Sequence, residues 1–284
     1  MDVTSLMRRS ALFNADRTAI VAGEHRLTFA QAWQRGCRMA NALRSLGVTP
    51  GDRVGVLEDN SVEAADMFIG AGIAGAVRVP LYPRNSVEAH QHMLGHTDCK
   101  VLVVSANHAA DVTGIDQSVP SLEHMVVRDD GYEDWLASFS DEDPMIECGP
   151  DDNYIIRHTG GTTGMSKGVA YTHKTWLDAG RDWFYLLPPV LPGDACMHIG
   201  PISHGSGYLF LPTFLGMAKV VVLAAQPLGQ FRQFSAGDAV FARDGLDGIE
   251  ALFDPVAPRR VHVERLAVAA QGIGGLCKLD TGAS

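Results

Sequence analysis

The sequence predicts an α/β fold in which parallel sheets are flanked by helices. Strand patterns alternate with helical patterns between Arg17 and Ser105, and this alternation favours parallel strands joined by right-handed crossovers. The run Lys100–Ser105 contains an uninterrupted Val-Leu-Val-Val, which is typical of a strand buried on both faces of a parallel sheet. The chain has 284 residues and is 46% hydrophobic, which is enough to bury a substantial core in one large or two ordinary domains.

The first expected elements are a short hairpin and a helix. Two strand patterns, Arg17–Val21 and Arg26–Phe29, flank Gly23, and a glycine between two β-favouring runs is typical of a turn. Ala30–Leu46 then has helical periodicity and is followed by Gly47, a residue type that commonly ends helices. We therefore expect a hairpin, a helix and its C-cap in that order.

Two strand–helix units and another strand are expected next. The sequence Thr-Pro-Gly-Asp at 49–52 predicts a turn, and Asn60 with Glu63 has the spacing of a capping box. The apolar run Met67–Val77 is too short to span a bilayer, so it predicts a core helix. The expected elements are the strand Arg53–Leu57, the helix Ser61–Ala74, the strand Val77–Leu81, a helix around Ser86–Gly95 and the strand Lys100–Ser105.

The middle of the chain predicts a connector, a hairpin and a helix. The segment 129–152 is rich in Asp and Glu, and we expect a solvated connector there. The β-favouring runs Tyr154–His158 and Val169–His173 enclose a glycine-rich decamer. Thr175 can cap a helix that ends at Leu186, before two prolines.

The decamer itself reads Thr-Gly-Gly-Thr-Thr-Gly-Met-Ser-Lys-Gly. Its glycines let backbone N–H groups converge on one point, which makes a concave anion site, while the threonine hydroxyls and Lys167 add donors and a positive charge. A polyphosphate-binding loop is therefore predicted at Thr159, Gly160, Gly161, Thr162, Thr163, Gly164, Lys167 and Gly168. The Walker pattern is absent, because a strand and not a helix follows the lysine. An ordinary glycine-rich hairpin is the structural alternative.

This decamer resembles the phosphate-loop signature of the adenylate-forming enzymes, which include acyl-CoA synthetases, luciferases and peptide-synthetase adenylation domains. The usual form is Thr-Ser-Gly-Thr-Thr-Gly-x-Pro-Lys-Gly, and the chain departs from it at Gly160 and Ser166. Gly160 lacks a hydroxyl that would face a phosphate, and Ser166 lacks the fixed φ of proline. The resemblance runs from about Arg17 to Leu223 and includes the stretch 74–84.

The resemblance implies the N-terminal part of that family's large domain, with parallel sheets flanked by helices. It also implies ATP, Mg²⁺ and coenzyme A as cofactors. Lys167 would then be a catalytic cation beside the phosphates, and Thr163 a metal ligand.

A second motif lies at Ile199–Tyr208, which reads Ile-Gly-Pro-Ile-Ser-His-Gly-Ser-Gly-Tyr. Its glycines let the backbone approach a ligand closely. It resembles the Pro-x-x-His-Gly-x-Gly segment that lines the acyl pocket in the same family. The resemblance implies that His204 is a catalytic and substrate-binding residue beside the reacting carboxylate, and that Gly205, Ser206 and Gly207 also bind substrate. A lone histidine without such a motif is more often structural.

The part of the sequence after the expected strand Lys219–Leu223 does not match the family pattern. The Tyr-Gly-x-Thr-Glu motif, the ribose-binding aspartate and the small C-terminal domain with its lysine are missing from the sequence. We therefore divide the chain into residues 1–225, the N-terminal part of the adenylation domain, and 226–284, a divergent tail. A frameshift, a truncation and real divergence are alternatives that the sequence leaves open. Without its usual neighbours, the strand Lys219–Leu223 is expected to be an exposed edge.

These patterns favour an ATP-dependent ligase of the acyl-CoA synthetase type that acts on a fatty or other apolar carboxylic acid. The apolar stretch Tyr208–Phe214 suits an aliphatic acid better than a charged amino acid. The alternative is an inactive nucleotide-binding remnant or pseudogene product. Because a moving domain and several stabilising groups would be missing, we expect that the chain as it stands does not complete acyl-CoA formation.

Composition and charge exclude several other classes of protein. The net charge of -10 opposes binding to nucleic acid and anionic membranes. No apolar h-region follows the arginines near the N-terminus, and no transmembrane segment is predicted, so we expect a cytoplasmic protein. The sequence does not indicate the oligomeric state.

The cysteines and a histidine cluster give no clear metal site. Five scattered cysteines without a Cys-x-x-Cys pair indicate reduced thiols. His90, His92 and His96 could include a metal-binding pair, but a solvated helix face is the favoured interpretation because no carboxylate or cysteine joins them at ligand spacing.

Overall fold

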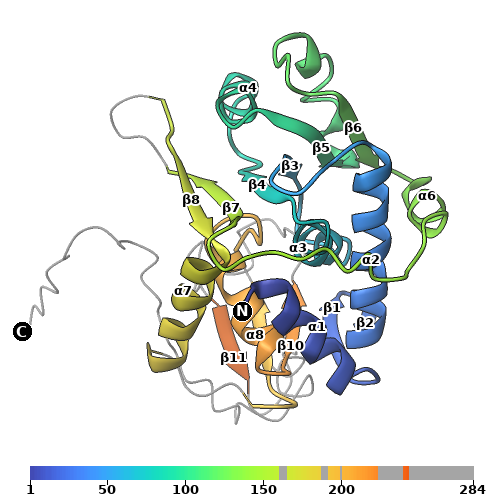
Figure 1. The fold of residues 1–284 in the computed structure, drawn as a ribbon, viewed down its shortest axis with the longest axis vertical. Coiled ribbons are helices and arrows are strands. Elements are labelled where there is room, and N and C mark those ends of the chain that lie inside the picture. The colour runs from blue at the N-terminus through green and yellow to red at the C-terminus, as the bar shows by residue number, and fades with distance from the viewer. Residues whose placement is uncertain (160–164, 187–190, 199, 223–238, 243–284) are drawn as a thin grey trace, which may run out of the picture.

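The computed structural model describes residues 1–159, 165–186, 191–198, 200–222 and 239–242, which form two mixed β-sheets with helices between and around them (Figure 1). The strands are β1 (Thr18–Ala22), β2 (His25–Thr28), β3 (Arg53–Leu57), β4 (Val77–Leu81), β5 (Cys99–Ser105), β6 (His124–Arg128), β7 (Asn153–His158), β8 (Gly168–Thr172), β9 (Ala195–His198), β10 (Lys219–Val222) and β11 (Ala239–Ala242). The helices are α1 (Val3–Phe13), α2 (Phe29–Ser45), α3 (Ala64–Ile73), α4 (Val87–His96), α5 (Ala106–Ala109), α6 (Tyr132–Ala137), α7 (His173–Leu186) and α8 (Phe210–Leu215), with 3₁₀ turns η1 (Ile115–Gln117) and η2 (Gly205–Leu209). The predicted α/β class is confirmed.

The larger sheet has the strand order β6-β5-β3-β4-β7-β8. Its pairs from β6 to β7 are parallel, as the alternation of strands and helices predicts, and only β7 and β8 are antiparallel. The hairpin β7–β8 extends from the rest of the molecule at one edge of this sheet (Figure 1). Thr159 and Lys167, which flank the centre of the glycine-rich decamer, thus lie at the far end of the hairpin formed by β7 and the edge strand β8.

The smaller sheet has the order β11-β9-β10-β1-β2. The predicted hairpin is present, since β1 and β2 are antiparallel, and β10 is parallel to both β1 and β9. The expectation of an exposed edge at Lys219–Leu223 is therefore wrong for β10. Strand β10 pairs with β1 on one side and with β9 on the other. Strand β9 was not predicted from the sequence.

Helices α2 and α3 lie between the two sheets (Figure 1). Val54 and Val101 of the larger sheet share one core with Ile20 and Val220 of the smaller sheet and with both helices. The two helices approach closely at Gly70, where an added Cβ would lie 2.7 Å from the Met39 Cβ atom. A smaller core on the opposite face of the larger sheet contains residues of α4 and η1. The larger sheet is therefore covered on both faces, as a mostly parallel sheet requires.

The acidic segment 129–152 is not a solvated connector throughout, and this expectation is partly wrong. Residues Tyr132–Ala137 form α6, with the Tyr132 ring buried. Ion pairs fasten the segment to the first two helices: Arg35 Nη1 lies 2.6 Å from Glu133 Oε2, and Arg8 Nε lies 2.7 Å from Asp143 Oδ2. Some of the carboxylates that suggested solvent exposure, among them Glu133 and Asp143, are thus matched by arginines distant in the sequence.

Two expected helix starts differ in the structure. Helix α3 begins at Ala64, with Glu63 at the N-cap and no side-chain cap, because the Asn60 side chain bonds elsewhere, as described below. At α7, Thr172 precedes the first residue, its N–H donates to Thr175 Oγ1 at 2.8 Å, and Thr175 N–H donates to Thr172 Oγ1 at 3.2 Å. Thr172 therefore takes the cap position predicted for Thr175.

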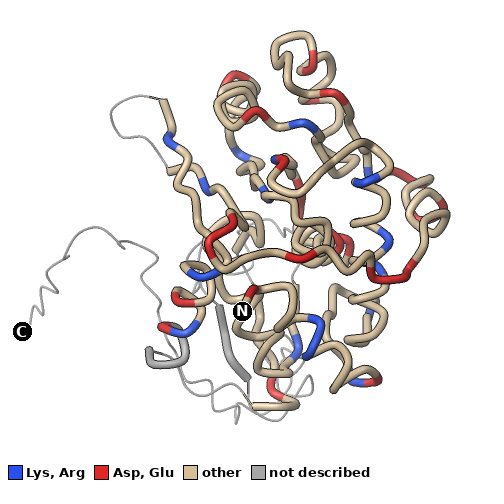
Figure 2. The backbone as a smooth tube through the Cα atoms, viewed as in Figure 1, with Lys and Arg blue, Asp and Glu red and all other residues tan. Residues whose placement is uncertain are grey.

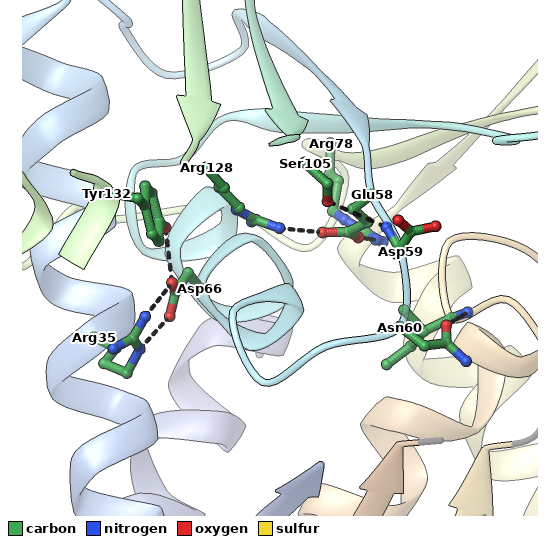
Figure 3. A network of polar contacts seen from close by, with 10 residues as sticks. Arg35, Glu58, Asp59, Asn60, Asp66, Arg78, Ser105, Arg128 and Tyr132 are labelled. Carbon is green, nitrogen blue, oxygen red and sulfur yellow. Dashed lines mark hydrogen bonds and ion pairs between the residues drawn. The ribbon is translucent and has the colours of Figure 1, made fainter. Parts of the chain in front are cut away.

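A buried polar network connects strand ends of the larger sheet with α3 (Figure 3). Arg78 Nη2 and Arg128 Nη1 donate to the two oxygens of Glu58 at 2.8 and 2.9 Å, and all three side chains are buried. In the neighbouring part of the network, Asp66 of α3 accepts hydrogen bonds from Arg35 and from Tyr132 Oη. Each buried carboxylate therefore has matching donors, which compensate for the loss of water.

Within the described ranges, no helix is both long and apolar enough to cross a membrane.

The described cysteines, Cys37, Cys99, Cys148 and Cys196, are free thiols. Burial raises the pKa of Cys196 to about 12. That thiol is therefore protonated and unreactive at neutral pH.

Candidate functional site

The neck of the predicted phosphate loop is formed by Thr159 and Lys167. Thr159 N–H donates to the Lys167 carbonyl at 2.9 Å, one step beyond the His158–Gly168 register of β7 and β8. The Lys167 residue is exposed and makes no ion pair with the described residues. Its charge is therefore available to an anion at the neck. Of the predicted loop residues, Gly160, Gly161, Thr162, Thr163 and Gly164 lie outside the described residues.

Helix α4 contacts the chain at Ser166, directly before Lys167. His92 Nε2 donates to the Ser166 carbonyl at 2.9 Å, and the His92 ring stacks on His96 with centroids 5.5 Å apart. The interpretation of the three histidines as a solvated face is only partly right: His96 is exposed, but His90 is buried and its Nε2 bonds to the Tyr82 carbonyl. In the part of the chain that the structure describes, no three His, Cys, Asp or Glu side chains are grouped to hold a metal.

A second histidine beside the loop is electrically neutral. Burial, together with the neighbouring His96 and His92, lowers the pKa of His158 to about 4. The His158 ring lies edge-on to His96, with centroids 6.3 Å apart. At neutral pH this side of the hairpin therefore carries no charge from His158.

The turn that carries His204 is anchored to the segment before α3. Asn60 Nδ2 donates to the Gly200 carbonyl at 3.0 Å, and Asn60 Oδ1 accepts from Ile202 N–H at 2.8 Å. The His204 N–H donates to the Pro201 carbonyl at 2.9 Å, which closes the turn. Asn60, expected to cap a helix, instead positions the second motif (Figure 3).

Both motifs line one cavity of about 620 Å³. Thr159 and Ser166 come from the loop neck, and Ser203 and His204 come from the turn after β9. Tyr82, which follows β4, closes one side, and its ring centroid lies 5.0 Å from that of His204. The structure thus brings together a loop predicted to bind phosphate and a turn predicted to bind an acid.

The remaining residues of the second motif support the turn from behind. Ser206 and Gly207 are buried, and neither contributes to the lining of this cavity. The Ser206 carbonyl accepts a hydrogen bond from His198 Nδ1 at 3.0 Å. Gly207 packs against the Ile202 carbonyl and the Phe68 ring, which leaves no room for a side chain.

His198 makes this support sensitive to acid. Burial lowers its pKa to about 4, although the bond to Ser206 opposes the shift. The unfolded chain, with a pKa near 6.5, binds a proton that the folded chain excludes, so stability present above pH 6.5 is lost as the pH falls toward 4. We expect His198 to account for a loss of about 2 to 3 kcal/mol between pH 7.5 and 4.5. Urea unfolding at both pH values should show a flatter dependence for His198→Gln than for the wild type.

The matched control is His25→Gln, because His25 is exposed on β2. It should keep the wild-type pH dependence. If His198→Gln has the same pH dependence as the wild type, His198 does not titrate as its burial requires.

Arg157 is a site residue that the sequence analysis missed. It lines the cavity from β7, is 8% exposed, and its guanidinium carbon lies 4.0 Å from the centroid of the Tyr208 ring. Burial lowers the pKa of Arg157 to about 10. The pKa of His204 is lowered by its own burial and, in addition, by the positive charge of Arg157. Its one sequence signal is an arginine within the apolar strand run Tyr-Ile-Ile-Arg.

Comparison with known proteins identifies a family and several relatives. Residues 7–235 match the family described as AMP-binding enzyme. The long-chain-fatty-acid–CoA ligase FadD13 of Mycobacterium tuberculosis is 36% identical over 160 residues, which cover 56% of this chain and 32% of the relative. The feruloyl-CoA synthase of an Amycolatopsis species is 32% identical over 226 residues, which cover 76% of this chain and 43% of the relative.

A solved structure gives the same result for the fold. The inhibitor-bound N-terminal domain of FACL13 from Mycobacterium tuberculosis has a TM-score of 0.75 and 28% identity, and the match covers 80% of this chain and 57% of that chain. The chain spans less than half the length of the curated relatives it matches.

Proposed function

Because the chain belongs to the AMP-binding enzyme family, we propose that it carries out acid activation as part of an ATP-dependent acyl-CoA ligase. The observation that carries the proposal is the shared cavity, which Thr159 lines from the loop neck and His204 from the acid-binding turn. Activation of an acid needs the acid and the triphosphate to meet at one point. A single cavity lined by both motifs supplies that point.

In the proposed first step, a carboxylate oxygen of the acid attacks the α-phosphorus of ATP. The bond from that phosphorus to the bridging oxygen breaks, and pyrophosphate leaves with the electron pair. In the second step the thiol of coenzyme A attacks the acyl carbon, AMP leaves with the bonding pair, and the thiol proton passes to solvent. The result is an acyl thioester.

The chain contributes mainly charge stabilisation and positioning to the first step. Lys167, exposed at the neck, holds the negative charge that develops on the pyrophosphate, together with the hydroxyl of Thr159. By the family resemblance, Gly160, Gly161, Thr162 and Gly164 would supply further N–H and hydroxyl donors. Thr163 would hold Mg²⁺, which neutralises phosphate charge when bound.

Tyr82 lines the cavity beside His204, and further aromatic rings lie behind Arg157. Tyr208, which contacts the Arg157 guanidinium, stacks on Trp176 with centroids 5.0 Å apart, and Tyr171 Oη lies 3.4 Å from Tyr208 Oη. Aromatic surroundings of this kind suit an apolar or aryl acid. The relatives named above act on long-chain fatty acids and form feruloyl-CoA, and we propose an apolar carboxylic acid for this chain too.

Replacing Lys167 by alanine tests the phosphate side. The change removes a cation whose charge-assisted hydrogen bonds contribute about 1.5 to 3 kcal/mol, so the affinity for ATP or pyrophosphate should fall roughly tenfold to a hundredfold. Titration calorimetry measures it. Lys174→Ala is the control, because Lys174 is also exposed but pairs with Asp178 on α7. Equal affinities in Lys167→Ala and the wild type would remove Lys167 from the phosphate site.

The proposed reaction is tested by acid-dependent exchange of labelled pyrophosphate into ATP, on full-length chain of verified mass. Exchange that requires an added fatty or aryl acid supports acid activation. The second candidate function is nucleotide binding without catalysis. ATP binding without any exchange would select that candidate.

A further inference from the structure

Three hydrogen-bond donors face the cavity without an acceptor among the described residues. The Ser203 hydroxyl is buried and unpaired, and the Arg157 guanidinium makes no ion pair within the described part of the chain. His204, at the open side of the same cavity, is also without a described hydrogen bond to its ring. This wall therefore offers donors and one positive charge. Glu88 of α4 also lines the cavity, but it is exposed and makes no ion pair with Arg157.

The hairpin that carries Arg157 contributes no carboxylate of its own. No Asp or Glu occurs between Asn153 and Thr172, and Figure 2 shows basic but no acidic residues on the described part of β7 and β8. Glu58, a buried carboxylate that follows β3, is held by Arg78 and Arg128. It is not available to Arg157.

An unpaired buried guanidinium is unfavourable, so its presence points to a ligand. Arg157 keeps its charge at neutral pH, since its lowered pKa is still about 10. The Tyr208 ring compensates for part of the lost hydration through a cation–π contact. An aliphatic chain bound against this wall would displace more water from the Arg157 guanidinium and would offer it no hydrogen-bond acceptor.

We propose that Arg157 and Ser203 bind a carboxylate of the acid substrate inside this cavity. The proposal rests on the proposed function and assigns to it two substrate-binding residues. A planar guanidinium can bind a carboxylate with two parallel N–H bonds, and the Ser203 hydroxyl can donate a third. The carboxylate is either the group that reacts or a second acidic group on the acid.

Acid binding without ATP tests the assignment. Titration calorimetry with hexanoate, hexanedioate and hexanamide is run on the wild type, Arg157→Met, Arg157→Lys and Ser203→Ala. Arg157→Met should lose roughly tenfold to a hundredfold in affinity for a carboxylate, whereas hexanamide, which has no charge, should be unaffected. Arg157→Lys should recover part of the loss, and Ser203→Ala should weaken binding several-fold. Arg26→Met, a change of an exposed arginine on β2, is the matched control.

The three ligands also distinguish the two sources of the carboxylate. Equal losses for hexanoate and hexanedioate mean that Arg157 holds the reacting group. A loss for hexanedioate alone means that it holds a second acidic group. Unchanged binding of both acids in folded Arg157→Met and Ser203→Ala overturns the proposal, and so does a loss confined to ATP. ATP affinity, measured separately, shows whether the phosphate side of the proposed function stands.

Discussion

Replacing Glu58 by alanine is expected to lower the free energy of unfolding by about 3 to 5 kcal/mol, because the change leaves two buried arginines without their carboxylate. Glu58 is 1% exposed, and its two oxygens accept from Arg78 and Arg128 at 2.8 and 2.9 Å. The guanidinium groups cannot reach water without opening the sheet. Such a loss is a large fraction of the total stability of an ordinary domain.

Urea denaturation followed by circular dichroism measures this change. Glu58→Gln keeps the shape and loses the charge, so it should fall between the wild type and Glu58→Ala. Glu24→Ala is the control, since Glu24 is exposed in the turn between β1 and β2. A loss below about 1 kcal/mol in Glu58→Ala would mean that Arg78 and Arg128 find other partners.

Replacing Gly207 by alanine is expected to cost about 3 kcal/mol of stability and to displace the turn that carries His204. An added Cβ would overlap the Ile202 carbonyl oxygen and would lie 3.1 Å from Phe68 Cζ. A backbone oxygen cannot rotate away as a flexible side chain can. The turn must therefore move, and Ser203 and His204 move with it.

Thermal unfolding and the acid titrations described above measure the two effects of this change. Gly95→Ala in α4 is the control, because an added Cβ there meets no atom within 4 Å, and alanine favours a helix. It should leave stability equal or slightly raised. If Gly207→Ala retains wild-type stability and acid affinity, the close packing at Ile202 does not determine the turn.

Local patterns predicted most of the larger sheet. The run Val-Leu-Val-Val lies in β5 and is buried, and the β-favouring runs on both sides of the decamer form β7 and β8. Elements with a weak local signal were missed. Strand β9 has only the four residues Ala-Cys-Met-His. Helix α6 was missed because its Glu133 is matched by Arg35, which is far away in sequence.

The site was predictable only in parts. The motifs around Lys167 and His204 were visible in the sequence because each is a continuous stretch. Their meeting in one cavity, and the role of Asn60 in anchoring the second motif, depend on the packing of distant segments. Arg157 could be read as a strand residue but not as an unpaired charge, since the partners of a side chain are not set by its neighbours in sequence.

The pairing of β1 with β10 has a consequence for the order of folding. Ile20 lies opposite Val220, so the centre of the smaller sheet joins residues about 200 positions apart, a closure that is slow because the chain must lose much entropy before the contact forms. Strands β3, β4 and β5, by contrast, are near neighbours in sequence. On a ribosome the larger sheet can assemble while the strand that completes the smaller one is still unmade, and until then hairpin β1–β2 has an open edge that a chaperone or another nascent chain can bind.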